Sequence, residues 1–288
     1  MPRLAAVAAA FGRDLDHALE RVATLVAHAR RDGVDLLVLP DAALGGYLPA
    51  LEPGQGMDRS HRAAAGPGRP LQEPDLPPAL PDGHPALRRV ADLAGSMTVC
   101  VGYREQAGPT CYNTAICVTG DGVLGRHRKV HQPPGEARAY AAGDGFAAFD
   151  TPVGRLGMLI DYDKTFPEAA RTLAVDGAQV LACLSAWPTS VTNRAARMNQ
   201  DRQSRLFDLY DRARAAENQV VLVSSNQTGV LGGMRFLGQA KVVGPGGDVL
   251  ARTWAKAGIA AADVDLDAEI GTARRVLHHL KERRPDAY

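Results

Sequence analysis

Residues 154–171 have the sequence GRLGMLIDYDKTFPEAAR, in which an apolar strand runs into a polar turn and then into a helix. The run LGMLIDY at 156–162 is apolar on both faces, which predicts a strand buried between other layers of the protein. A helical pattern follows from Glu168 to Asp176. Asp161 is therefore expected near the end of a buried strand, shortly before a helix begins.

Strand and helix patterns alternate on both sides of this segment. Before it, residues 14–31 repeat apolar side chains at helical spacing, and the apolar run VDLLVLP at 34–40 predicts a buried strand. Strands are also expected at 97–103 and 112–120, with Gly120-Asp121-Gly122 as a hairpin turn after the second. The remaining expected elements are strands at 179–187, 219–226, 240–250 and 259–266 and helices at about 192–218 and 269–284.

This alternation, interrupted by hairpins, predicts an α/β protein in which helices cover the outer faces of two packed sheets. The chain has 288 residues, which fits one large α/β domain or two small ones. A core of that size stabilises a fold without a disulfide or a structural metal.

Charge and composition exclude several classes of protein. Lys and Arg number 33 against 32 Asp and Glu, so the basic surplus typical of nucleic-acid binding is missing. No run of 18 apolar residues occurs, and the opening MPRLAAVAAAFGRD lacks a signal-peptide pattern, so we expect no membrane association. The four cysteines form no CxxC motif, which indicates reduced thiols in a cytoplasmic protein and no metal site. We expect no organic cofactor.

Residues 49–86 differ from the rest of the chain because they are rich in Pro and Gly and show no clear period. Since strands continue on both sides, one interpretation is an ordered insertion or a lid over a site. A disordered surface loop is the other interpretation.

Three segments of this chain resemble the carbon–nitrogen hydrolase (nitrilase) family. They are VDLLVLPDAALGGY at 34–47, GRHRKVHQPPGE at 125–136, and the segment at 154–171 quoted above. They resemble, in order, the family's segments for its catalytic Glu, its catalytic Lys and its nucleophilic Cys. The similarity extends over almost all of the chain and is weakest at 49–90.

The resemblance implies one domain over residues 1–288 with an αββα sandwich, which dimerises through helices into an αββααββα assembly. It also implies a catalytic Glu–Lys–Cys group with a second Glu nearby. Lys129 matches the Lys, and Glu136 matches the second Glu. Asp41 stands at the position of the first Glu, and Asp161 at the position of the Cys. Pocket-lining, substrate-binding roles are expected for three aromatic residues, Tyr47, Tyr162 and Trp187.

The replacement at position 161 changes the chemistry that is possible there. In the family a thiolate attacks an amide or nitrile carbon while the Glu moves protons and the Lys stabilises the anionic intermediate. A carboxylate at Asp161 is a poor nucleophile toward an amide, because its product is a mixed anhydride that lies uphill. The residue types therefore exclude thioester formation at this position.

The replacement at position 41 shortens the acid by one methylene, roughly 1 to 1.5 Å, which costs about 10²-fold in rate when nothing else moves. Asp161 projects further than a cysteine sulfur, so the two changes indicate a mutual adjustment that preserves the volume of the pocket floor. With Glu136, three carboxylates then surround Lys129. They cannot all ionise cheaply, so we expect a shared proton and a raised apparent pKa.

Two functions remain open at this point. The first is an enzyme acting on a C–N bond of a small molecule by acid–base chemistry, such as a condensation, cyclisation or elimination in secondary metabolism. The second is a catalytically inactive relative that serves as a binding or scaffold protein, in which Lys129 simply bridges acids. Both predict a cytoplasmic homodimer with a small-molecule pocket.

Overall fold

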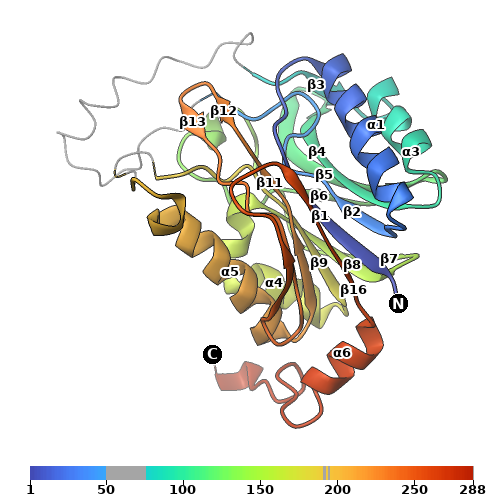
Figure 1. The fold of residues 1–288 in the computed structure, drawn as a ribbon, viewed down its shortest axis with the longest axis vertical. Helices are drawn as coiled ribbons and strands as arrows, with labels where there is room; N and C mark the ends of the chain where they lie inside the picture. The colour runs from blue at the N-terminus through green and yellow to red at the C-terminus, as the bar shows by residue number, and fades with distance from the viewer. Residues whose placement is uncertain (50–75, 191–192, 194, 288) are drawn as a thin grey trace.

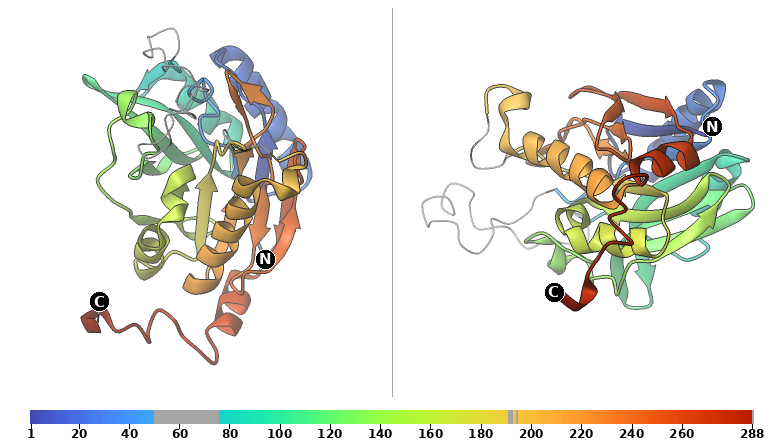
Figure 2. Two further views of the ribbon diagram at one scale, coloured as in Figure 1. Left: turned by 90° about the vertical axis from the view of Figure 1, so that its left-hand side faces the viewer. Right: turned by 90° about the horizontal axis from the view of Figure 1, so that it is seen from below.

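Two β-sheets lie face to face in the middle of the molecule, with helices on their outer faces (Figure 1, Figure 2). The computed structural model describes residues 1–49, 76–190, 193 and 195–287. In the first sheet the strands follow the order β11-β1-β2-β4-β5-β6, with β16 beside β1 and β3 beside β4. Its strands are β1 (Arg3–Ala9), β2 (Leu36–Val38), β3 (Ala79–Pro81), β4 (Thr98–Ala107), β5 (Thr110–Thr119), β6 (Gly122–Arg128), β11 (Asn226–Gln227) and β16 (Gly258–Asp263).

The second sheet follows the order β15-β14-β10-β9-β8-β7, and its central strands β8, β9 and β10 run parallel. Its strands are β7 (Ala148–Thr151), β8 (Gly154–Ile160), β9 (Val180–Leu184), β10 (Val221–Ser224), β14 (Lys241–Val243) and β15 (Val249–Arg252). A separate hairpin joins β12 (Val230–Leu231) to β13 (Met234–Arg235).

Side-chain alternation along β1 shows how the layers are held together. Leu4, Ala6 and Ala8 belong to the apolar core between the two sheets, whereas Ala5 and Val7 belong to the core beneath the helices. Helices α1 (Leu15–Arg31) and α3 (Pro85–Ala94) cover the first sheet, and α4 (Pro167–Val175) and α5 (Arg202–Asn218) cover the second. The predicted αββα sandwich is therefore confirmed.

The structure corrects two of the expected helices and adds one. The helix expected from about residue 192 begins at Arg202, because the Asp201 side chain caps it by accepting a hydrogen bond from the backbone N–H of Gln203. The helix expected at 269–284 is instead α6 (Leu266–Ala273). Beyond it Val276 is 85% exposed and Leu277 is 58% exposed, although Leu280 packs against the core of the second sheet. This part of the chain therefore lacks the continuous apolar face that stabilises a helix by packing. Helix α3 was not anticipated.

Of the Pro/Gly-rich segment at 49–86, residues 50–75 lie outside the described part of the chain. The rest is partly regular, since β3 pairs in parallel with β4 and α3 begins at Pro85. No helix among the described residues is long and apolar enough to cross a membrane.

Candidate active site

Asp41, Lys129 and Asp161 follow strands β2, β6 and β8, respectively. The carboxyl ends of the two sheets meet at this point, because the backbone N–H of Asp41 donates a hydrogen bond to the carbonyl of Ser185, which follows β9. The sandwich thus brings together three residues that are far apart in the sequence.

Lys129 lies at the centre of the site and is almost fully buried. Its ammonium group donates to Oε1 of Glu136 at 2.8 Å and to Oδ2 of Asp161 at 3.2 Å. The hydroxyl of Tyr47 donates to the same Oε1 of Glu136. One ammonium and one phenol therefore hold a single carboxylate oxygen of Glu136, while Asp161 is bound through one oxygen.

Asp41 is held by a second set of contacts. Asn113 on β5 donates from Nδ2 to Oδ2 of Asp41 at 3.1 Å. The backbone carbonyl of Asn113 accepts a hydrogen bond from the backbone N–H of Lys129 at 2.8 Å. Gln227 donates from Nε2 to the Asp41 carbonyl at 2.8 Å. Asn113 therefore fixes Asp41 and Lys129 relative to each other.

A close approach of two backbones determines where Asp41 lies. A Cβ atom at Gly102 on β4 would lie 2.7 Å from the backbone nitrogen of Ala42 and 3.0 Å from Cα of Asp41. Only glycine lets the turn after β2 pass this close to β4.

Asp161 occupies a strained backbone conformation. Its φ is +50°, in the left-handed region that few residues other than glycine adopt, although Asp tolerates it better than most. It begins the short helix η3 (Asp161–Thr165), directly after β8. This sharp turn directs the Asp161 carboxylate toward Lys129, and strain of this kind occurs most often at functional sites.

Three buried carboxylate oxygens at the site receive no hydrogen bond from any described residue. They are Oδ1 of Asp41, Oδ1 of Asp161 and Oε2 of Glu136. Leaving such atoms unpaired costs free energy, so these oxygens are available to a proton or to a polar ligand. Among the described residues, no group of three or more His, Cys, Asp or Glu side chains is arranged to hold a metal ion.

Burial and mutual repulsion shift the pKa values of the site. Burial, aided by the charges of Asp161 and Glu136, raises the pKa of Asp41 to about 7. Burial also raises the pKa of Glu136. Burial opposes the charged form of Lys129, but the three surrounding carboxylates outweigh it and raise the pKa of that ammonium. Asp41 is therefore a carboxyl group that exchanges a proton near neutral pH.

Asp163 supports the site without belonging to its charged centre. It accepts hydrogen bonds from the rings of His127 at 2.9 Å and His131 at 3.0 Å, and from the backbone N–H of His131 at 2.9 Å. Burial opposes its ionisation, but these bonds outweigh burial and hold the pKa of Asp163 well below its usual value. Asp163 thereby joins the segment that carries Lys129 to the turn that carries Asp161.

The sequence predicted no role for Asp163, although it lies inside the segment 154–171 that carried the resemblance, and none for Asn113, which lies outside the three segments. Of the three aromatic residues expected to line a pocket, Tyr47 is fully buried against Glu136. Tyr162 is half-buried and packs edge-on to Phe166. Trp187 packs against Phe207 of α5 and donates from its indole N–H to Gln203 at 2.9 Å. Their roles in substrate binding remain predictions.

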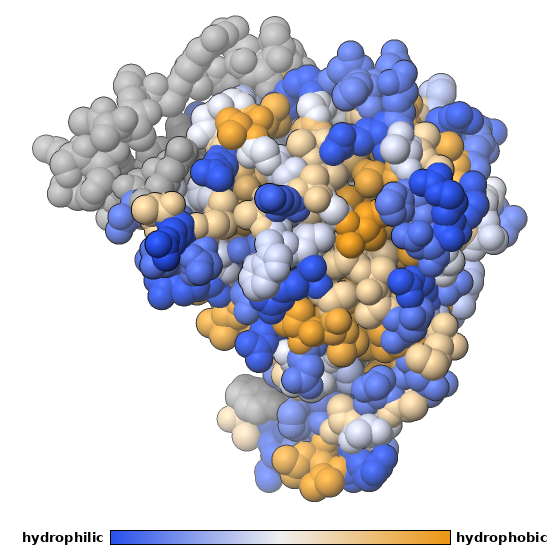
Figure 3. All heavy atoms as spheres, viewed as in Figure 1, coloured by the Kyte–Doolittle hydropathy of each residue, from blue (hydrophilic) through white to orange (hydrophobic). Residues whose placement is uncertain are grey.

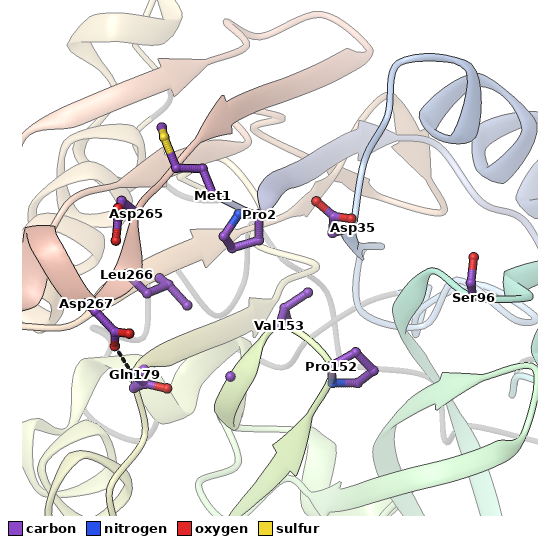
Figure 4. Close-up of a pocket in the computed structure, with 11 residues that line it drawn as sticks. Met1, Pro2, Asp35, Ser96, Pro152, Val153, Gln179, Asp265, Leu266 and Asp267 are labelled. Carbon is purple, nitrogen blue, oxygen red and sulfur yellow. Dashed lines mark hydrogen bonds between the residues drawn. The ribbon is translucent and has the colours of Figure 1, made fainter.

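A cavity of about 560 Å³ lies away from these carboxylates, at the opposite end of the sandwich. Figure 4 shows it beside the amino ends of β1, β2 and β8, with Met1, Asp35 and Asp265 around it. Asp267 lies at its edge and accepts a hydrogen bond from Gln179 at 3.1 Å. This cavity is therefore separate from the catalytic candidates.

The fold matches that of solved amidases and carbon–nitrogen hydrolases. A carbon–nitrogen hydrolase from Helicobacter pylori G27 is similar with a TM-score of 0.80 and 24% identity, over 100% of this chain and 96% of that one. An amidase from Nesterenkonia sp. AN1, in which the acetamide moiety of fluoroacetamide is added covalently at the active site cysteine, is similar with a TM-score of 0.75. Its identity is 23%, over 99% of this chain and 95% of that one.

Sequence comparison identifies the family in addition to the fold. Residues 3–274 match the carbon–nitrogen hydrolase family model, so the chain belongs to the carbon–nitrogen hydrolase family. An N-carbamoylputrescine amidase of Solanum lycopersicum is 30% identical over 99% of this chain and 94% of its own length. An (R)-stereoselective amidase of Pseudomonas sp. is 32% identical over 95% of this chain and 88% of its own length. That Asp161 stands in place of a cysteine nucleophile remains a prediction.

Proposed function

We propose that this chain is an enzyme that hydrolyses an amide-type C–N bond of a small molecule, with Asp161 and Asp41 as base and acid and without a thioester. The observation that carries this proposal is that each of these two buried carboxylates beside Lys129 has one oxygen that receives no hydrogen bond from the described residues. Two carboxyl groups that lie beside the same ammonium can serve one substrate as base and acid. The amidases among the relatives favour water as the attacking group.

In this mechanism Oδ1 of Asp161 removes a proton from water as the water oxygen attacks the carbonyl carbon. The carbonyl electron pair moves to oxygen, where the Lys129 ammonium and the backbone N–H of Tyr162 stabilise the negative charge. Protonated Asp41 then donates its proton to the leaving nitrogen as the C–N bond breaks. The products are a carboxylic acid and an amine or ammonia, and the proton on Asp161 returns to Asp41 through solvent.

This assignment fixes the direction of the pH dependence. Asp41 must carry its proton to act as the acid, and the pKa of Asp41 is raised to about 7 by burial. The rate constant kcat/KM should therefore fall as the pH rises through about 7. An Asp41→Asn variant donates no proton to the leaving nitrogen, so this fall should be absent from its residual activity.

The test is a screen of small primary amides, carbamoyl amines and nitriles for release of ammonia or carboxylate. Turnover by the wild type that is lost in both Asp161→Asn and Lys129→Ala supports the proposal. If no turnover depends on either residue, the protein is instead a binding or scaffold protein with an inactive site. Both variants need an intact fold, which circular dichroism and thermal unfolding verify.

A second variant separates the mechanism from the fold. The double substitution Asp161→Cys and Asp41→Glu restores the residue types that the family resemblance implies. With hydroxylamine present, a thioester-forming enzyme transfers its acyl group to give a hydroxamate. The double variant should form hydroxamate from an amide substrate, whereas the wild type should release the acid without an acyl-enzyme that mass spectrometry detects. An acyl adduct on wild-type Asp161 would contradict direct attack by water.

We also propose that two copies of the chain associate through the outer faces of α4 and α5. Val175 at the end of α4 is 53% exposed, and Leu209 on α5 is 58% exposed. An interface between two copies through these helices would bury both side chains, and apolar patches of this kind occur at protein–protein contacts. Figure 3 shows further hydrophobic side chains at the surface on the face that Figure 1 presents. Sedimentation of the wild type as a dimer and of Leu209→Glu as a monomer would support this assembly.

The remaining proposals concern domain structure and location. A single domain over residues 1–288 is supported by the family match at 3–274 and should give one cooperative unfolding transition. A cytoplasmic location is supported by four free thiols, of which Cys100 and Cys117 lie opposite each other on β4 and β5. Fractionation of cells that express the protein tests this location.

A further inference from the structure

The short helix η3, which begins at Asp161, is held by a buried arginine of helix α5. Arg214 donates from Nε to the carbonyl of Lys164 at 2.8 Å and from Nη2 to the carbonyl of Thr165 at 2.9 Å. Its Nη1 donates to Glu217 at 2.8 Å, which balances its charge. Arg214 is one of the buried residues of α5, so these contacts do not involve the outer face through which we propose that two copies associate.

The sequence explains why η3 needs a donor from another element. In a short helix of the 3₁₀ type, the carbonyl of Lys164 would accept a hydrogen bond from the backbone N–H three residues later. That residue is Pro167, which begins α4 and has no N–H to donate. The guanidinium of Arg214 supplies the missing donor, and its charge makes these hydrogen bonds roughly twice as strong as neutral ones.

A second contact ties η3 to the same helix. The ammonium of Lys164 donates to Oδ1 of Asp211 at 2.7 Å and lies 3.2 Å from the centre of the Phe207 ring. The side chains of Lys164 and Asp211 are both fully buried. Helix α5 therefore holds the backbone and the side chain of Lys164, which lies three residues after Asp161.

We propose that Arg214 is a positioning residue for Asp161, because it fixes the turn that directs the Asp161 carboxylate toward Lys129. Asp161 has a φ of +50°, and strained conformations of this kind persist only where the surrounding structure holds them. Relaxation of η3 would disturb the contact of 3.2 Å between Asp161 and Lys129. The effect on catalysis rests on the proposed function, in which Asp161 is the base.

The first experiment measures the pKa of Asp41 by ¹³C NMR of protein labelled at its aspartate carboxyl groups, with Asp41→Asn to assign the signal. Burial is the main cause of the rise of this pKa to about 7, Lys129 opposes it, and the charge of Asp161 adds to it. If Arg214→Met lets Asp161 move away, the pKa of Asp41 should fall by about half a pH unit or more. In an Asp161→Asn background, Arg214→Met should cause no further fall, because the charge is already absent.

The matched control is Arg155→Met, at the opposite end of β8 from Asp161. Arg155 also donates from Nε to a backbone carbonyl, that of Asp176 at 2.7 Å. Its replacement should leave the pKa of Asp41 unchanged. Arg214→Lys keeps the charge but loses the forked donors that reach two carbonyls, so its effects should be smaller and in the same direction. It carries the test if circular dichroism shows that Arg214→Met does not fold.

The second experiment uses an amide that the wild type hydrolyses. Arg214→Met should lower kcat by about 10-fold to 10²-fold and change KM by less than about threefold, since a misplacement of 1 Å at a catalytic group costs up to 10²-fold in rate. Arg155→Met should match the wild type in both constants.

Three outcomes would overturn the proposal. They are an unchanged pKa of Asp41 in Arg214→Met, an equal fall with and without the Asp161 carboxylate, and a kcat of Arg214→Met equal to that of the wild type. The NMR measurement needs no turnover. Failure of the proposed function, in which no amide is hydrolysed, is therefore distinguishable from failure of Arg214 to position Asp161.

Discussion

The Asp41→Asn substitution tests whether this carboxyl group is held protonated by burial. Asn keeps the shape of Asp and accepts the same hydrogen bond from Asn113 through its carbonyl oxygen. The substitution therefore removes the titration of the acid and leaves the packing largely unchanged.

The expected magnitude follows from the shift in the pKa of Asp41, which burial raises from an ordinary value of 3.8 to about 7. Because the folded-state pKa is the higher one, the unfolded chain loses this proton first as the pH rises. The stability that Asp41 contributes is thus complete below pH 3.8 and is lost progressively up to about pH 7. Linkage gives a loss of about 2.5 kcal/mol between roughly pH 5 and 8, which the Asn variant should not show.

The assay is urea unfolding at half-unit steps across this pH range, followed by tryptophan fluorescence. The free energy of unfolding of the wild type should fall relative to that of Asp41→Asn by about 2.5 kcal/mol across the range. Asp121→Asn, in the exposed turn between β5 and β6, is the control and should follow the wild type. A constant difference between wild type and Asp41→Asn would refute the raised pKa and the acid role of Asp41 with it.

Three further substitutions probe the groups around this acid. Lys129→Met should destabilise the fold by about 3 kcal/mol or more at neutral pH and less in mild acid, because three buried carboxylates lose their counter-ion. Asp163→Asn should lower the free energy of unfolding by about 2 to 4 kcal/mol near neutral pH, measured by thermal unfolding. Burial opposes the depressed pKa of Asp163, but the hydrogen bonds from the histidines outweigh it, so this loss of stability should shrink as the pH falls. Gly102→Ala should lower the free energy of urea unfolding by about 1 to 3 kcal/mol, since its Cβ would lie 2.7 Å from the Ala42 nitrogen. Gly145→Ala is the control, because its Cβ would meet no described atom within 4 Å.

Each of these expectations has a contrary outcome. A loss for Lys129→Met that is the same in acid as at neutral pH would mean that the carboxylates do not depend on this ammonium. Equal stability of Asp163→Asn and wild type would remove the proposed link between the two segments of the site. Similar losses for Gly102→Ala and Gly145→Ala would show that backbone crowding at the Asp41 turn is unimportant.

Local patterns were sufficient to predict most of the fold. The hairpin between β5 and β6 follows from glycines that allow its turn, and the buried strand β8 follows from an apolar run on both faces. Local patterns failed where tertiary contacts decide the outcome. The segment after Ala273 leaves Val276 and Leu277 exposed and contacts the core through Leu280, so no continuous apolar face continues the helix.

The candidate site was predictable only in part for a similar reason. Lys129 and Glu136 came from motif positions, and the structure places them 2.8 Å apart. The contact between Asn113 and Asp41 joins residues 72 positions apart, and no local spacing in the sequence predicts it. Likewise, the effect of Asp163 depends on two histidines that reach it only once the sheets have packed.

The energetic cost of the site supports a catalytic role over that of an inactive binding or scaffold protein. Asp161 holds a left-handed backbone at φ +50°, and three buried carboxylate oxygens lack partners among the described residues. Replacing a buried ionic cluster by apolar side chains is often neutral or stabilising. A chain released from catalysis would therefore gain stability by losing these acids and the strain. This chain instead keeps both acids beside Lys129, and burial raises the pKa of Asp41 to about 7. The use of Asp41 and Asp161 as a proton-transferring pair, as we propose, would account for the retained acids and for the strain at Asp161.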